Sequence, residues 1–130
     1  MPSINAIHHV AFTVTDVERS AAWYADLLGM VVVLAGDEDA VRYRVLAHQA
    51  SGCVVGLRQY PAGSGDGFDE LRTGLDHLAF GVDSADELAA WESELSSRGV
   101  PFTPAAVTPI GTVVVFRDPD DIQLEFWLPG

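Results

Sequence analysis

HVAFTVTDVERSAAWYADLL, residues 9–28, returns later in the chain as HLAFGVDSADELAAWESELS, residues 77–96. A constant shift of 68 residues aligns the two stretches without a gap. The identical pairs run through both segments: His9/His77, Ala11/Ala79, Phe12/Phe80, Val14/Val82, Ala21/Ala89, Ala22/Ala90, Trp23/Trp91 and Leu27/Leu95. A repeat of about half the chain length indicates a duplicated supersecondary unit, because a solenoid needs at least about three repeats.

Each copy is predicted to contain a strand, a capped helix and then three further strands. The first copy has strands at about 9–14, 30–35, 41–47 and 53–60, and a helix that begins after Thr15 or Asp16 and runs to Leu28. The second has strands at about 75–82, 102–107, 112–117 and 122–127, and a helix at 84–97 whose apolar stripe, like that of the first, includes the tryptophan. The expected fold is α+β, with two tandem βαβββ modules (about 5–60 and 75–130) in one domain. The glycine-rich residues 61–74 are predicted to form a mobile linker or flap.

Composition narrows the classes of function. Nineteen acidic and seven basic residues give a net charge of −12, which disfavours nucleic-acid binding. No apolar run approaches the length of a membrane span, and the first residues lack the features of a secretory signal. Cys53 is the only cysteine, so the chain has no internal disulfide. We therefore expect a soluble cytoplasmic protein whose partner is a small molecule rather than a nucleic acid or a membrane.

Strand alternation assigns side chains to the two faces of each sheet. His9 shares its face with the small Ala11, and His77 shares its face with Ala79 and Gly81, whereas the large apolar residues point to the helix. In the last strand, Gln123, Glu125 and Trp127 lie on the face opposite the core. A histidine among small residues leaves space for a ligand, and a carboxylate there is costly to bury unless it is paired.

Two imidazoles and one carboxylate suit zinc, iron, manganese, nickel or cobalt, with coordination positions left for water or substrate. The alternative for a single strand histidine is a hydrogen-bonded structural role. The repeat-equivalent positions of His9 and His77, together with Glu125, favour the metal site. His8 and His48 are expected to be solvated, and Cys53 to be a small core residue.

Three stretches resemble the glyoxalase/bleomycin-resistance/dioxygenase superfamily, also called vicinal oxygen chelate proteins. They are IHHVAFTVTDVERSAAWYADLLGM (7–30), TGLDHLAFGV (73–82) and FRDPDDIQLEFW (116–127). The resemblance implies two modules that form an open cup, pairing into a homodimer, and metal ligands at His9, His77 and Glu125. Glyoxalase I enzymes take a fourth ligand, a glutamate, from the last strand of the first module, but Gly56 stands at that position here. Members with three ligands, such as extradiol dioxygenases and antibiotic-modifying transferases, stay compatible.

The resemblance leaves two functions open. In an enzyme, the metal chelates two oxygens of a small substrate, and Glu125 is a ligand that can also act as a catalytic base. Arg58 is then a candidate contact for an anionic substrate group, and further ligand-binding candidates are Tyr60, Phe68, Gln123 and Trp127. In a binding protein of the bleomycin-resistance type, an aromatic molecule is sequestered without chemistry and the metal is absent.

Overall fold

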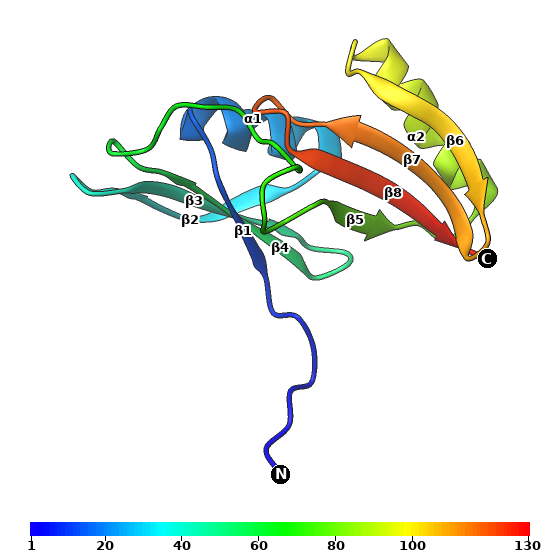
Figure 1. The fold of residues 1–130 in the computed structure, drawn as a ribbon, viewed down its shortest axis with the longest axis horizontal. Coiled ribbons are helices and arrows are strands. Elements are labelled where there is room, and N and C mark those ends of the chain that lie inside the picture. The colour runs from blue at the N-terminus through cyan, green and yellow to red at the C-terminus, as the bar shows by residue number, and fades with distance from the viewer. The chain divides into compact units, whose positions relative to one another are not determined.

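The computed structural model describes residues 1–130 and divides the chain into two compact units, residues 1–66 and 67–130. Both units have the same element order, a strand, a helix and three strands (Figure 1). The expected α+β fold of two tandem βαβββ modules is therefore confirmed. Each unit is described by itself below.

The first unit contains a four-stranded sheet in the order β1-β4-β3-β2, in which β1 runs parallel to β4 and the other pairs are antiparallel. Its helix packs against β3 and β4. The elements are β1 (Val10–Thr13), α1 (Val17–Leu28), β2 (Val31–Asp37), β3 (Arg42–His48) and β4 (Cys53–Gln59).

The second unit repeats this arrangement in the order β5-β8-β7-β6, with β5 parallel to β8. Its helix packs against β6 and β8. The elements are β5 (Leu78–Gly81), α2 (Ala85–Ser97), β6 (Phe102–Thr108), β7 (Gly111–Arg117) and β8 (Gln123–Pro129). No helix of the chain is both long enough and apolar enough to cross a membrane.

Both helices begin at a capping side chain. Of the two candidates in the first unit, Asp16 is the N-cap, since its carboxylate accepts from Arg19 N at 3.1 Å. Ser84 caps α2 by accepting from Glu87 N at 3.1 Å. Gly29 ends α1 in the left-handed region, with φ +64°, which a residue without a side chain adopts without strain. Local sequence chemistry therefore sets where both helices begin and where α1 ends.

The prediction that Trp23 belongs to the apolar stripe of α1 is off by one residue. Tyr24, not Trp23, is the fully buried aromatic of α1, whereas Trp23 is half-buried and contacts Tyr24 edge to face at 4.9 Å. The buried positions of α1 start at Val17, and a helical period carries them on to Tyr24 and Leu27. In the second unit the prediction is better, because Trp91 stacks on Phe126 with ring centroids 4.2 Å apart.

Part of the predicted linker belongs to the second unit. Phe68 N donates to Asp120 O at 2.8 Å, and both carboxylate oxygens of Glu70 accept from the Arg117 guanidinium, at 2.8 and 3.1 Å. These contacts tie Phe68 to the turn between β7 and β8, and Glu70 to the last residue of β7.

Candidate functional site

His77 and Glu125 meet in the second unit. His77 lies immediately before β5, one residue outside the strand that was predicted to contain it, and Glu125 lies in β8, paired in register with Ala79. The distance from His77 Nε2 to Glu125 Oε2 is 3.5 Å. The Glu125 side chain is only 13% exposed and that of His77 is 42% exposed. The partly buried Glu125 carboxylate thus faces an imidazole nitrogen of its own unit.

Asp76 fixes the orientation of the His77 ring. Asp76 Oδ1 lies 2.7 Å from His77 Nδ1, and an ionised carboxylate only accepts, so Nδ1 donates the proton of this hydrogen bond. In the neutral ring, Nε2 then presents its lone pair toward the Glu125 carboxylate. Two acceptors that face each other at 3.5 Å repel unless a proton or a metal ion lies between them. A cation between the two groups would relieve this repulsion.

Asp76 is itself held by a series of hydrogen bonds that runs through Gln123 and Arg117 to Glu70. Gln123 Nε2 donates to Asp76 Oδ1 at 3.0 Å and to Asp76 O at 3.2 Å, while Gln123 Oε1 accepts from Arg117 Nη2 at 3.1 Å. Arg117 in turn binds Glu70. The hydrogen bonds from Arg117 lower the pKa of the Glu70 carboxyl to about 2, and Glu70 raises the pKa of Arg117. Gln123, expected to bind a ligand, is here occupied in holding Asp76.

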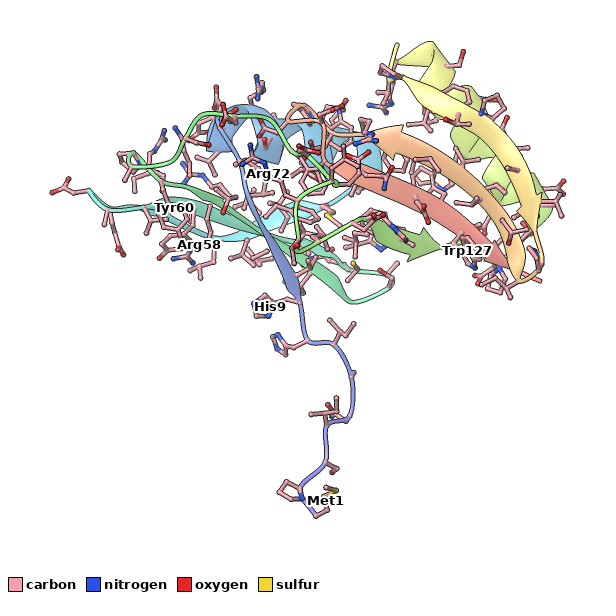
Figure 2. The ribbon with its side chains drawn as sticks, in the orientation of Figure 1. Met1, His9, Arg58, Tyr60, Arg72 and Trp127 are labelled. Atoms are coloured by element: carbon pink, nitrogen blue, oxygen red, sulfur yellow. The ribbon has the colours of Figure 1, made fainter.

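His9 belongs to a different surface, in the first unit. It lies immediately before β1, and a hollow of about 200 Å³ opens beside it, lined by residues of β1, β3 and β4. Figure 2 shows His9 at the beginning of β1, with Arg58 and Tyr60 together near the end of β4. The lining residues are His8, His9, Ala11, Tyr43, Arg44, Val45, Val54, Gly56, Leu57 and Arg58.

The other two histidines have partners. His8 is exposed, as expected, but its Nδ1 also lies 2.8 Å from His9 Nδ1, so the prediction that it is merely solvated is incomplete. His48 is the last residue of β3, and its Nδ1 lies 2.7 Å from Ser51 Oγ in the turn that leads to β4. Cys53 is half-buried at the start of β4, and this burial raises the pKa of its thiol.

Strand register shows why Gly56 is compared with the glutamate that is the fourth ligand of glyoxalase I enzymes. In the first unit Ala11 pairs with Gly56, and in the second unit the repeat-equivalent Ala79 pairs with Glu125. Gly56 therefore occupies in its sheet the position that Glu125 has in the other, as the sequence alignment predicted. A Cβ at Gly56 would lie 3.2 Å from the Ala11 Cβ, a close approach even for alanine. The first unit offers no carboxylate ligand at this position.

The remaining predicted residues separate by unit. Tyr60 follows β4 in the first unit, where its hydroxyl accepts from Arg58 Nε at 2.9 Å. Phe68 and Trp127 belong to the second unit, and Trp127 pairs in register with Gly81. Two contributors were missed, Asp76 and Tyr43. The place of Asp76 directly before a candidate ligand was a usable signal, whereas nothing local marks Tyr43.

The structure thus brings together two of the three predicted ligands, His77 and Glu125, and places His9 in the other unit. No group of three His, Cys, Asp or Glu side chains is arranged to hold a metal ion. An imidazole nitrogen and a carboxylate are nevertheless donors that zinc, manganese and iron accept. The donor set of the second unit fits part of such a site.

Comparison with known proteins points to one family. A model described as Glyoxalase/Bleomycin resistance protein/Dioxygenase superfamily matches residues 6–126. Two bacterial relatives described as uncharacterized, YwkD of Bacillus subtilis and YaeR of Escherichia coli, are each 29% identical to the chain. The first match covers 95% of this chain and 97% of YwkD, and the second covers 98% of each.

Solved structures agree. A glyoxylase/bleomycin resistance protein/dioxygenase domain from Frankia sp. EAN1pec is 36% identical, with a TM-score of 0.91 over 98% of this chain and 100% of that one. A variant of the fosfomycin resistance protein FosX from Listeria monocytogenes, complexed with Mn(II) and 1S,2S-dihydroxypropylphosphonic acid, is 16% identical. Its TM-score is 0.74, and the match covers 96% of this chain and 90% of that one. At that identity the likeness to FosX concerns the fold.

Proposed function

The chain belongs to the glyoxalase/bleomycin resistance protein/dioxygenase superfamily, and on that premise we propose that it is a metal-dependent enzyme acting on a small oxygen-bearing molecule. In this proposal His9, His77 and Glu125 are the protein ligands of one divalent metal. The observation that carries it is the 3.5 Å contact between His77 Nε2 and the Glu125 carboxylate.

The burial of Glu125 supports a metal over a solvated ion pair. Its side chain is 13% exposed, and its ion-pair partner in the second unit is the His77 imidazole. A carboxylate that is largely removed from water is costly unless a cation or hydrogen-bond donors compensate it. His77 Nδ1 donates to Asp76, and metal-bound histidines commonly make such a bond from the nitrogen that does not bind the metal, because it fixes the ring and raises its basicity.

His9, His77 and Glu125 would hold the divalent metal, which when bound would supply Lewis-acid stabilisation of negative charge that develops on substrate oxygens. The chain's own residues hold and orient the ligands: Asp76 fixes His77, and Gln123 fixes Asp76. Glu125 would also be a candidate base if it exchanged off the metal. The Mn(II) complex of FosX is support by analogy of fold.

The alternative is a protein that sequesters an aromatic molecule without a metal. The net charge of −12 and the exposed ring of Tyr60 are the features that favour it, since both suit a flat cationic ligand. The His77–Glu125 pair has no role in that function. We therefore prefer the enzyme.

Metal analysis distinguishes the two functions. Protein purified without a nickel column is expected to carry about one equivalent of a transition metal, and Glu125→Gln is expected to lose most of it. Glu38→Gln, which removes an exposed glutamate next to β2, is the matched control and should keep its metal. Metal-free wild-type protein that takes up no added zinc or manganese, yet binds a flat aromatic cation tightly, would contradict the enzyme and support sequestration.

A further inference from the structure

Arg58 stands apart among the arginines of this acidic chain. It is exposed on β4, and no carboxylate of the first unit pairs with it, although acidic residues outnumber basic ones by nineteen to seven. Five other arginines each lie within 4.0 Å of a carboxylate: Arg42, Arg44, Arg72, Arg98 and Arg117. The positive charge of Arg58 is therefore available to bind an anionic group from outside the first unit.

Two tyrosines hold the Arg58 guanidinium in place. Its central carbon lies 5.7 Å from the centroid of the Tyr43 ring and 5.8 Å from that of Tyr60, within the range of cation–π attraction. Nε donates to the Tyr60 hydroxyl at 2.9 Å. This bond uses one of the five N–H groups, so the terminal nitrogens, whose fork fits a carboxylate or phosphate, stay available.

The position of Tyr43 depends on the strand beside it. Gly36 of β2 is paired in register with Tyr43, and a Cβ at Gly36 would overlap the Tyr43 ring. Only glycine at this position allows the ring to lie across β2 as it does. Three strands thus contribute to the setting of one guanidinium, β2 through Gly36, β3 through Tyr43 and β4 through Arg58 itself.

A low floor separates Arg58 from His9. Both residues line the same hollow. Along the strands, the paired Ala11 and Gly56 lie between the position of His9 and the position of Arg58. Arg58 pairs with Thr13, which follows His9 by four residues in the same strand direction. His9 and Arg58 are therefore separated by about 13 Å along the strands. Both side chains border the hollow. The floor therefore has room for a molecule of a few carbon atoms.

We infer that this hollow binds a small anionic molecule, whose carboxylate or phosphate group is held by the terminal nitrogens of Arg58. The inference deepens the proposed function, because an anionic group at Arg58 leaves the rest of the molecule on the side of His9, a proposed metal ligand. Anion binding itself needs no metal. It is therefore tested in metal-free protein, where failure of the metal site has no effect.

Two probes, inorganic phosphate and malonate, are titrated separately into chelator-treated ¹⁵N-labelled protein at constant ionic strength, with the arginine Nε–Hε signals followed by NMR. The Arg58 signal is expected to shift saturably with at least one probe, and the stronger response tells whether phosphate or carboxylate is preferred. The Arg72 signal, from an exposed arginine that does not line the hollow, is expected not to follow it. Equal and unsaturated shifts of both arginines would overturn the inference.

Variants provide the second arm. Arg58→Gln should weaken binding of the preferred probe by at least about tenfold, and Arg58→Lys should lose most of the affinity because a point charge replaces the fork. Arg72→Gln removes the same charge elsewhere and should bind as the wild type does. Tyr60→Phe deletes only the acceptor for Nε and should weaken binding by a few-fold. Unchanged affinity in both Arg58→Gln and Tyr60→Phe would refute the assignment.

Discussion

Replacing Asp76 by alanine tests whether His77 is a metal ligand that needs its neighbour. The change removes the carboxylate that accepts from His77 Nδ1 at 2.7 Å, and with it the partner of Gln123 Nε2 at 3.0 Å. Loss of such an outer contact weakens metal binding by about 10- to 100-fold. Asp76 and His77 are 66% and 42% exposed, so water replaces part of the lost interaction. We expect the low end, about tenfold or 1.4 kcal/mol.

The assay is competition for Zn²⁺ between the protein and a fluorescent chelator, on wild type, Asp76→Ala and Asp83→Ala. Asp83 is an exposed aspartate at the other end of β5, and its removal takes away the same charge without touching His77. The control should bind Zn²⁺ as the wild type does. Equal Zn²⁺ affinity in all three proteins would refute the reasoning. An equal loss of affinity in both variants would also refute it, because the change in net charge alone would then explain the effect.

Three further predictions concern stability. Arg117 lowers the pKa of Glu70 to about 2, so the Glu70–Arg117 pair stabilises the fold fully above the unfolded pKa near 4.5, and this stabilisation is lost as pH falls toward 2. In thermal unfolding, Glu70→Gln should therefore lose less stability across this pH range than the wild type. Phe126→Ala removes a ring that is 2% exposed and stacked on Trp91 and Phe116, and urea unfolding should show a loss of about 3–5 kcal/mol. Gly29→Ala forces a side chain onto φ +64°, and the same measurement should show a loss of about 1 kcal/mol.

The sequence predicts the repeated parts of this fold well because they rest on local chemistry. Asp16 and Ser84 cap their helices, and a gapless alignment of the two copies predicts that both sheets have the same topology. Alternation along β8 places Glu125 away from the core residues Leu124 and Phe126, as the structure has it. Each of these features depends on a few consecutive residues.

The contacts that were missed join residues far apart in the sequence. The bonds between Glu70 and Arg117, and between Asp76 and Gln123, each span 47 residues, and no local pattern pairs them. Leu27 of the predicted stripe is buried, but Tyr24 replaces Trp23 as the buried aromatic, and this depends on how the helix packs on β3 and β4. Tertiary contacts therefore supply the support of the site, while the sequence supplies the candidate ligands.

Metal titration of ¹⁵N-histidine-labelled protein is the most direct measurement of the central claim, that His9, His77 and Glu125 bind one metal. Zn²⁺ is added to chelator-treated wild type and Glu125→Gln, and the four histidines are followed separately. We expect the His9 and His77 signals to change together and to stop changing at one equivalent of Zn²⁺. We expect the His48 signal to stay unchanged and the Glu125→Gln variant to lose tight binding. A His77 response without His9, or equal binding by the variant, would contradict the central claim.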